Sequence, residues 1–208
     1  MSKEEIASLL LDIGAVTLRP DEPFTWASGI KSPIYCDNRL LLGFPEARKI
    51  VRSGFLQLIQ EHCANTEVIA GVATAGIPHA AWIAEALNKP LIYIRQAAKD
   101  HGKQNQVEGP LKTGQKVVVI EDLISTGGSS VSCVTAARQG GAVIEHCLAI
   151  FQYGFSEAQK KFDEIGCALH TLTDFATLLG VAKKRGRINK EQEELLKKFI
   201  TSPHHWLD

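Results

Sequence analysis

The chain has 208 residues, which at about 150 residues per domain predicts one or two domains around a sizeable core. Hydrophobic residues make up 45% and charged residues 22%, which excludes long disorder, a collagen-like repeat and a disulfide-rich scaffold. The 23 basic and 23 acidic side chains cancel to a formal net charge of zero, which argues against binding nucleic acid through phosphates or docking on an anionic membrane.

The cysteines and the first residues predict a cytoplasmic protein. Five cysteines are scattered without a Cys-x-x-Cys pair, which favours a reducing compartment over a disulfide framework or a zinc ribbon. The opening segment, MSKEEIASLLLDIGAV, lacks the basic flank and the long apolar run of a signal peptide. The longest uncharged stretch, 68–84, is interrupted by glycine, proline and histidine and falls short of the roughly 20 apolar residues of a membrane helix.

A short amphipathic helix is predicted at the start of the chain. Ser2 and Glu5 form a capping box ahead of apolar residues at helical spacing, and Gly14 ends the pattern. Residues 15–42 are rich in turn signals and predict small strands and loops, after which Pro45 begins a helix with one apolar face.

Apolar strands and helices alternate after this helix. The expected strands lie at 68–72, 91–94, 117–120 and 146–151, and the expected helices at about 78–87, 129–139, 156–165 and 189–200. Continuous apolar strands that alternate with helices predict a parallel sheet covered on both faces, an α/β fold. We expect the segment 168–172 and the last helix to pack as a flank, within one compact domain.

The segment VVVIEDLISTGGSS, residues 117–130, carries the clearest chemistry. Four strand residues lead into Glu121 and Asp122 and then into a loop of small residues that opens a helix. Ligand sites of open α/β sheets lie at the carboxyl ends of strands. Gly127 and Gly128 allow a tight backbone path, and with the loop hydroxyls and the helix N-terminus they predict a nest for a phosphate.

Two carboxylates beside this nest would repel an anion unless they bind another group. A ribose supplies that group, because Glu121 and Asp122 can accept hydrogen bonds from neighbouring hydroxyls while the loop binds the 5-phosphate. The Gly-Lys-Ser/Thr ending of a P-loop and the Gly-x-Gly-x-x-Gly of a dinucleotide fold are both missing. The alternative is an ordinary strand-to-helix loop with two solvated acids. The order of strand, diacid, glycines and helix favours a ribose 5-phosphate site.

The long segment 95–109, RQAAKDHGKQNQVEG, is cationic and has little to bury. It holds Arg95, Lys99, His101 and Lys103, with only small or β-branched apolar residues between them. A long polar loop between two core strands suits a lid that closes over a polyanion. The alternative is an exposed hairpin with scattered charge.

Four segments together resemble a known family. VVVIEDLISTGGSS is similar to the phosphoribosyl pyrophosphate (PRPP) signature of the type I phosphoribosyltransferases. FTWASGIKSPIYCDNR at 24–39, GVATAGIPHAAW at 71–82 and the loop at 95–109 resemble, in the same order, the orotate-specific members of that family. The resemblance runs from about Leu18 to Phe151.

The resemblance implies a fold and a reaction. The fold is that of type I phosphoribosyltransferases, an α/β fold with a central parallel sheet flanked by helices. The single domain, 1–208, has a PRPP-binding core at about 45–155 and a small hood formed by about 1–42 and the C-terminal flank. The reaction is transfer of the ribose 5-phosphate group of PRPP to orotate, giving orotidine 5-monophosphate and pyrophosphate in pyrimidine (UMP) biosynthesis. Magnesium is expected to bind through PRPP, with no direct protein ligand, and the enzyme is expected to be a homodimer with shared active sites.

The resemblance also assigns the PRPP site. Arg95, Lys99 and His101 fall on positions that bind pyrophosphate, and with Asp122 they are the catalytic candidates. The complete expected PRPP site is Thr74, Ala75, Arg95, Lys99, His101, Glu121, Asp122, Leu123, Ile124, Ser125, Thr126, Gly127, Gly128 and Ser129.

The expected orotate site is less complete. Ser125 and Tyr35 fall where relatives contact orotate. The chain departs from many relatives at Ala27, Ala75 and Gln96, where they carry lysine, and at Tyr153, in a segment that lacks their arginine. We therefore take Arg39 as the hypothesised partner of the orotate carboxylate.

Two other functions share parts of the pattern. A phosphoribosyltransferase for another base, such as a purine or uracil, would carry the same PRPP signature. A PRPP-responsive regulator that binds nucleic acid would use the same scaffold, with the basic cluster KKRGR at 183–187 as its contact. Such clusters are more often solvated loops or helix ends, and the zero net charge argues against nucleic acid as a partner.

Overall fold

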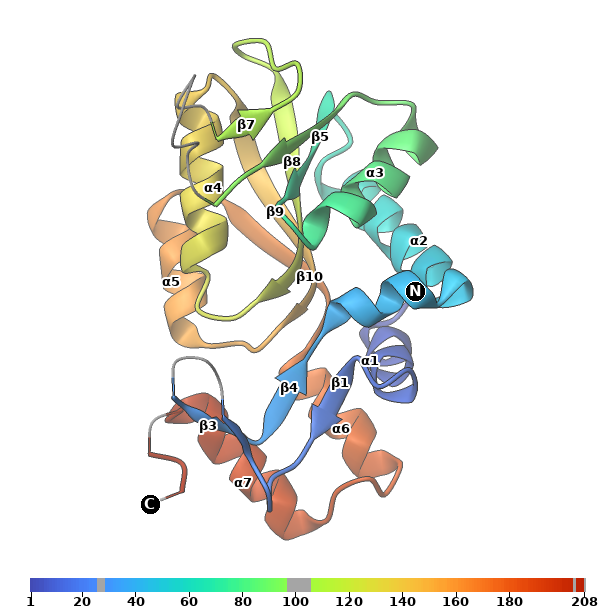
Figure 1. The fold of residues 1–208 in the computed structure, drawn as a ribbon, viewed down its shortest axis with the longest axis vertical. Coiled ribbons are helices and arrows are strands. Elements are labelled where there is room, and N and C mark those ends of the chain that lie inside the picture. The colour runs from blue at the N-terminus through green and yellow to red at the C-terminus, as the bar shows by residue number, and fades with distance from the viewer. Residues whose placement is uncertain (26–28, 97–105, 204, 208) are drawn as a thin grey trace.

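A computed structural model of the chain describes residues 1–25, 29–96, 106–203 and 205–207. Its centre is a six-stranded sheet in the order β10-β9-β8-β5-β6-β7 (Figure 1). The strands are β5 (Val68–Val72), β6 (Leu91–Ile94), β7 (Val107–Glu108), β8 (Lys116–Ile124), β9 (Val143–Gln152) and β10 (Ala168–Asp174). Neighbouring strands are parallel, except that β7 runs antiparallel to β6.

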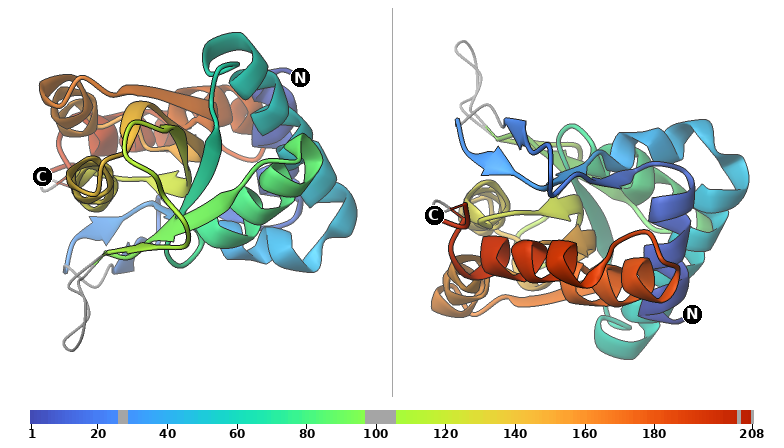
Figure 2. Two further views of the ribbon diagram at one scale, coloured as in Figure 1. Left: turned by 90° about the horizontal axis from the view of Figure 1, so that it is seen from above. Right: turned by 90° about the horizontal axis from the view of Figure 1, so that it is seen from below.

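Helices cover both faces of this sheet (Figures 1 and 2). The helices on one side are α1 (Lys3–Asp12), α2 (Pro45–His62) and α3 (Gly76–Leu87), and those on the other are α4 (Gly128–Gln139) and α5 (Ser156–Glu164). Within β8, Val118 and Ile120 belong to the core under α1, α2 and α3, whereas Val117 and Val119 belong to the core under α4 and α5. Alternate side chains are thus buried on opposite faces, which explains the continuous apolar strands and confirms the predicted α/β fold.

A smaller part lies beyond one end of the sheet (Figure 1). It contains β1 (Val16–Leu18) paired with β4 (Ile34–Cys36), β2 (Phe24–Thr25) paired with β3 (Lys31–Ser32), the 3-10 helix η1 (Asn38–Gly43), α6 (Phe175–Lys184) and α7 (Lys190–Thr201). The capping box of α1 is confirmed, because Ser2 Oγ accepts from the Glu5 backbone N–H and Glu5 accepts from the Ser2 backbone N–H. None of the helices in the described ranges is long and apolar enough to cross a bilayer.

The expectation that 168–172 packs as a flank is wrong. β10 contains this segment and forms an edge of the main sheet, parallel to β9, so the sheet extends beyond residue 155. An edge strand pairs on one side only, which lets polar residues such as His170 and Thr171 occupy it. The expected strand at 117–120 is also too short. β8 continues to Ile124, so Glu121 and Asp122 lie within a strand that pairs with β9.

Candidate active site

Three predicted binding segments leave the sheet at the same edge. β5, β6 and β8 are adjacent and parallel, with Gly71 of β5 opposite Ile120 of β8 and Val72 opposite Ile94 of β6. The loop at 73–75 follows β5, Arg95 follows β6, and the loop that begins at Ser125 follows β8. Residues far apart in the sequence thus converge where open α/β sheets bind ligands.

The first loop packs directly against β8. A Cβ atom on Gly76, the first residue of α3, would lie 2.5 Å from the Ile120 carbonyl oxygen and 3.5 Å from the Glu121 Cα. Only glycine allows so close an approach of two backbones. Thr74 is exposed and Ala75 is half-buried beside it, so both expected pyrophosphate contacts lie next to the diacid of β8.

The second loop has the geometry of a phosphate nest. Gly127 has φ +75°, a left-handed conformation that favours glycine, and it caps the N-terminus of α4. The Thr126 and Ser129 side chains are exposed at this helix start, and Ser125 is half-buried. Backbone N–H groups and hydroxyls at a helix N-terminus can bind an anion, so this loop has the arrangement that the predicted phosphate site needs.

Glu121 is the more deeply buried of the two acids, with 5% of its surface exposed. Its carboxylate accepts a hydrogen bond from Ser130 Oγ at 2.9 Å and one from the Asp122 backbone N–H at 3.1 Å. Burial raises the pKa of Glu121 well above its ordinary value, and the neighbouring Asp122 carboxylate raises it further. Ser130 is a contact that the sequence reasoning missed, because it becomes visible only when α4 folds back on β8.

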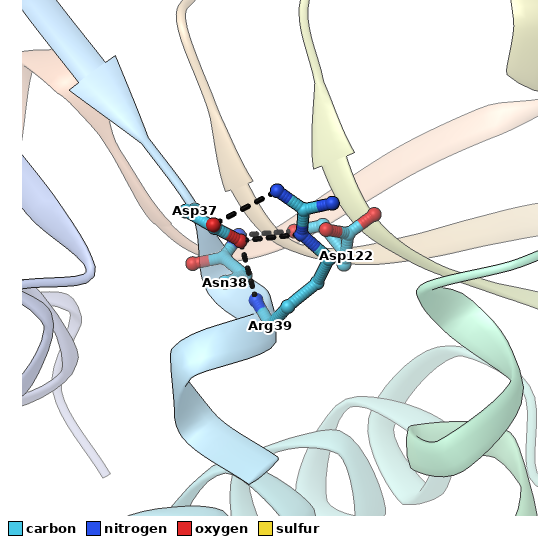
Figure 3. A network of polar contacts seen from close by, with 4 residues as sticks. All are labelled: Asp37, Asn38, Arg39 and Asp122. Carbon is cyan, nitrogen blue, oxygen red and sulfur yellow. Dashed lines mark hydrogen bonds and ion pairs between the residues drawn. The ribbon is translucent and has the colours of Figure 1, made fainter. Parts of the chain in front are cut away.

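Asp122 is half-buried and faces the turn that begins η1 (Figure 3). The Asn38 side-chain amide donates to the Asp122 backbone carbonyl at 2.7 Å. The Arg39 guanidinium, held by Asp37 at 2.6 and 2.8 Å, lies on the same side. Burial raises the pKa of Asp122, and its hydrogen bonds and the Arg39 charge oppose that rise.

The turn Asp37–Asn38–Arg39 thus supports Asp122, although Asn38 and Asp122 lie 84 positions apart in the sequence. Arg39 also donates its backbone N–H to Asp37 at 3.1 Å, and its hydrogen bonds lower the pKa of the Asp37 carboxyl. The sequence reasoning singled out Arg39 but missed Asn38 and Asp37. Their signal is a polar Asp-Asn-Arg run between the apolar segments 34–36 and 40–42.

The cationic loop is described only at its two ends. The Arg95 backbone N–H donates to the Gln106 carbonyl at 2.8 Å, and the Gln106 side chain returns a hydrogen bond to the Arg95 carbonyl at 2.9 Å. The Arg95 guanidinium lies 3.7 Å from the Glu108 carboxylate. Arg95 therefore occupies the predicted edge, whereas Lys99 and His101 lie outside the described residues.

The expected orotate residues have different surroundings. Tyr35 is exposed, and its ring lies 5.5 Å from that of Phe24. Tyr153 is 3% exposed and packs between Phe151 and Phe155, and burial raises the pKa of its hydroxyl. Tyr153 is thus part of the hydrophobic core. Ala27 lies outside the described residues.

The basic cluster at 183–187 is largely paired within the molecule. Arg185 and Arg187 both contact Asp12 at 2.7 Å, and Lys183 contacts Glu193 at 2.9 Å. These pairs join α6 to α7 and the segment after α6 to α1. These three cations of the cluster are therefore engaged with acidic side chains of the same chain, which gives the cluster a structural role.

The burial of Glu121 should make the free energy of unfolding depend on pH. A raised folded-state pKa means that the folded protein binds a proton that the unfolded chain has lost, so stability falls as pH rises above the ordinary value of 4.5. Glu121→Gln removes this titration. We expect the free energy of unfolding of the variant, relative to the wild type, to increase from about pH 5 to about pH 8 in urea titrations. Glu164→Gln, on the exposed side of α5, is the control, and a pH-independent difference for Glu121→Gln would contradict the burial argument.

Comparison with known proteins agrees with this geometry. Residues 41–165 match the family model "Phosphoribosyl transferase domain". The chain is 52% identical to the orotate phosphoribosyltransferase of Halalkalibacterium halodurans, over 97% of this chain and 96% of the relative. It is 54% identical to that of Streptococcus agalactiae serotype Ia, over 97% of each chain. The crystal structure of orotate phosphoribosyltransferase from Aeropyrum pernix superposes with a TM-score of 0.77 at 31% identity, covering 88% of this chain and 99% of that one.

These relatives span almost the whole chain, including the small part around β1 to β4, and they confirm the resemblance inferred from the motifs. The chain belongs to the orotate phosphoribosyltransferase family, within the type I phosphoribosyltransferases.

Proposed function

We propose that the protein transfers the ribose 5-phosphate group of PRPP to orotate, giving orotidine 5-monophosphate and pyrophosphate for pyrimidine biosynthesis. One observation carries the proposal: the β8 diacid, the Gly127 loop and the loop at 73–75 lie together at one edge of the sheet. The chain in which they do so is about half identical to orotate phosphoribosyltransferases. Pyrophosphate should be released from PRPP only when orotate is present, in an amount equal to the orotidine 5-monophosphate formed. Pyrophosphate release without orotate would contradict the proposed transfer to orotate.

The diacid would bind the ribose and the nest its 5-phosphate. Asp122 is half-buried beside the nest, and hydrogen bonds from ribose hydroxyls to an ionised carboxylate are among the stronger ones in proteins. As pyrophosphate leaves, the ribose becomes electron-poor and the leaving group gains negative charge. Carboxylates on one side and cations on the other would stabilise this separation more in the transition state than in bound PRPP.

Magnesium fits this site as an ion carried by PRPP. It prefers oxygen ligands and is commonly held by substrate phosphates. Both Glu121 carboxylate oxygens accept hydrogen bonds within the protein, so the half-buried Asp122 is the acid whose charge would attract such an ion. The ion would supply charge neutralisation on the pyrophosphate.

Lys99, His101 and Arg95 would stabilise the departing pyrophosphate. We expect Lys99→Ala to lower kcat by more than about tenfold, because single charge stabilisers are worth about 100-fold or more in other enzymes. Lys103→Ala removes a charge from the same segment without an assigned role and serves as the control. Steady-state kinetics at saturating PRPP measure the effect, and a near-normal kcat for Lys99→Ala would rule out the role.

Arg39 would bind the orotate carboxylate in place of the cations found in many relatives. Arg39→Ala should raise the orotate KM by about tenfold, equivalent to about 1.4 kcal/mol. Arg39→Lys keeps the charge but loses the planar fork, so an intermediate KM is expected. An orotate KM that stays at the wild-type value in both variants would remove Arg39 from the orotate site.

A homodimer and a cytoplasmic location complete the proposal. Leu40, Leu42, Phe44 and Ile50 expose about 40% of their surface each, on η1 and the adjoining part of α2. Exposed apolar patches mark interaction surfaces, and a second copy of the chain fits this one. The five buried cysteines are free thiols, as in proteins of a reducing compartment.

A further inference from the structure

Trp206 connects the segment after α7 to the β2–β3 hairpin. Its side chain is 3% exposed, and its indole N–H donates to the Lys31 backbone carbonyl at 2.8 Å. The ring meets Phe199 of α7 edge-on, with centroids 5.9 Å apart. A buried indole N–H requires an acceptor, so this hydrogen bond holds the Lys31 backbone in place beside the Trp206 ring.

Aromatic contacts brace Trp206 against the core. Phe199 meets Phe155 at 5.8 Å, Phe155 stacks on Tyr153 at 5.6 Å, and Tyr153 meets Phe151 of β9 at 5.5 Å. The Tyr153 backbone N–H donates to the carbonyl of Ile124, the last residue of β8. The indole is therefore fixed relative to the strand that carries the diacid.

The hairpin that Trp206 holds has little structure of its own. β2 and β3 have two residues each, with Phe24 opposite Ser32 and Thr25 opposite Lys31. Two-stranded hairpins are marginal in water without packing from elsewhere. The bond from Trp206 supplies such an anchor from a residue 175 positions away.

The same hairpin borders the active site. Ile30 lines a cavity of about 220 Å³ together with Thr126 of the phosphate loop, Phe155 and Pro203 of the segment after α7. From β3 the chain continues through Tyr35 to Asn38, which binds the Asp122 carbonyl. The segment that leads to Trp206 thus shares a cavity with the hairpin and the phosphate loop.

We propose that Trp206 is a positioning residue for the nucleobase: it sets the place of the segment 29–36 over the PRPP site and thereby the affinity for orotate. This inference rests on the proposed function, because the family resemblance places orotate contacts in this segment. The expected PRPP contacts lie on the core loops and not on this segment, so the affinity for PRPP should change little when Trp206 is replaced.

The test compares W206F with the wild type and with L207A. Phenylalanine keeps an aromatic ring beside Phe199 but removes the N–H donor, and Leu207 is exposed in the same segment. We expect W206F to raise the orotate KM about fivefold, to leave the PRPP KM within about twofold, and to speed hydrogen exchange in a peptide covering 29–36. L207A should match the wild type in all three.

Each outcome decides a different point. Unchanged hydrogen exchange in W206F would overturn the anchor, and equal rises in both KM values would reduce Trp206 to a structural residue. Faster exchange with an unchanged orotate KM would also overturn the positioning role. A wild-type protein inactive on orotate would overturn the proposed function instead, while the exchange comparison would still test the anchor.

Discussion

Replacing Gly76 with alanine is expected to lower kcat/KM for PRPP by about 100-fold. The added Cβ would lie 2.5 Å from the Ile120 carbonyl oxygen, well inside ordinary van der Waals contact, and that oxygen belongs to the backbone of β8, so it cannot rotate away as a side chain could. The loop at 73–75 and the start of α3 must therefore move away from β8 by a distance on the order of 1 Å, and displacements of that size can cost about 100-fold in rate.

Gly180→Ala provides the matched control for this prediction. Gly180 lies inside α6, and nothing is within 4 Å of the Cβ it would gain. Alanine there should stabilise the protein by up to about 1 kcal/mol without changing the kinetics. The Gly76 variant should instead lose about 1–3 kcal/mol through overpacking. Steady-state kinetics and thermal melting measure both effects, and a Gly76 variant whose kcat/KM stays within about threefold would refute the close approach.

Replacing Asp122 with alanine is expected to lower kcat/KM for PRPP by about 100-fold without unfolding the protein. Hydrogen bonds to an ionised group contribute about 1.5–3 kcal/mol, and 3 kcal/mol is roughly a 100-fold change. The backbone carbonyl that Asn38 binds remains in the variant, so the strand keeps this support. Glu121 also loses a neighbouring charge that raises its pKa, which should favour the folded state.

Asp163→Ala is the control for the loss of a carboxylate. Asp163 lies in α5, where it accepts a hydrogen bond from Gln159 on an exposed surface. Its kinetics should equal those of the wild type. The Asp122 variant should lose affinity for PRPP or turnover, while its melting temperature stays at or above the wild-type value. A drop in melting temperature together with an unchanged kcat/KM would mean that Asp122 is a structural acid.

Much of the sheet was predictable from the sequence because its strands are short continuous apolar runs. The run at 68–72 is buried on both faces, whereas the run at 91–94 exposes Tyr93, and the capping box of Ser2 and Glu5 is a local signal. β10 was missed because an edge strand carries polar residues, and the end of β8 was misplaced because Glu121 and Asp122 resemble loop residues. Burial of these acids is set by contacts with other segments.

The binding loops of the candidate site were predictable, but the supports around them were not. The order of diacid, Gly127 and helix start predicted the turn from β8 into α4 that a phosphate nest would need, and the structure has this turn. The bond from Asn38 to Asp122 joins residues 84 positions apart, and no local pattern encodes it. Tyr153 stacks on Phe155, and Phe155 in turn meets Phe199 of α7, so the aromatic cluster that contains Tyr153 is complete only in the folded chain.

The measurement that tests the central claim most directly is a substrate panel. The protein is incubated with PRPP and magnesium and with orotate, uracil, hypoxanthine or adenine, and loss of each base and release of pyrophosphate are followed together. The geometry and the family predict rapid, equimolar loss of orotate and pyrophosphate release, with the other three bases left essentially unchanged. Turnover of a purine or of uracil without turnover of orotate would contradict it.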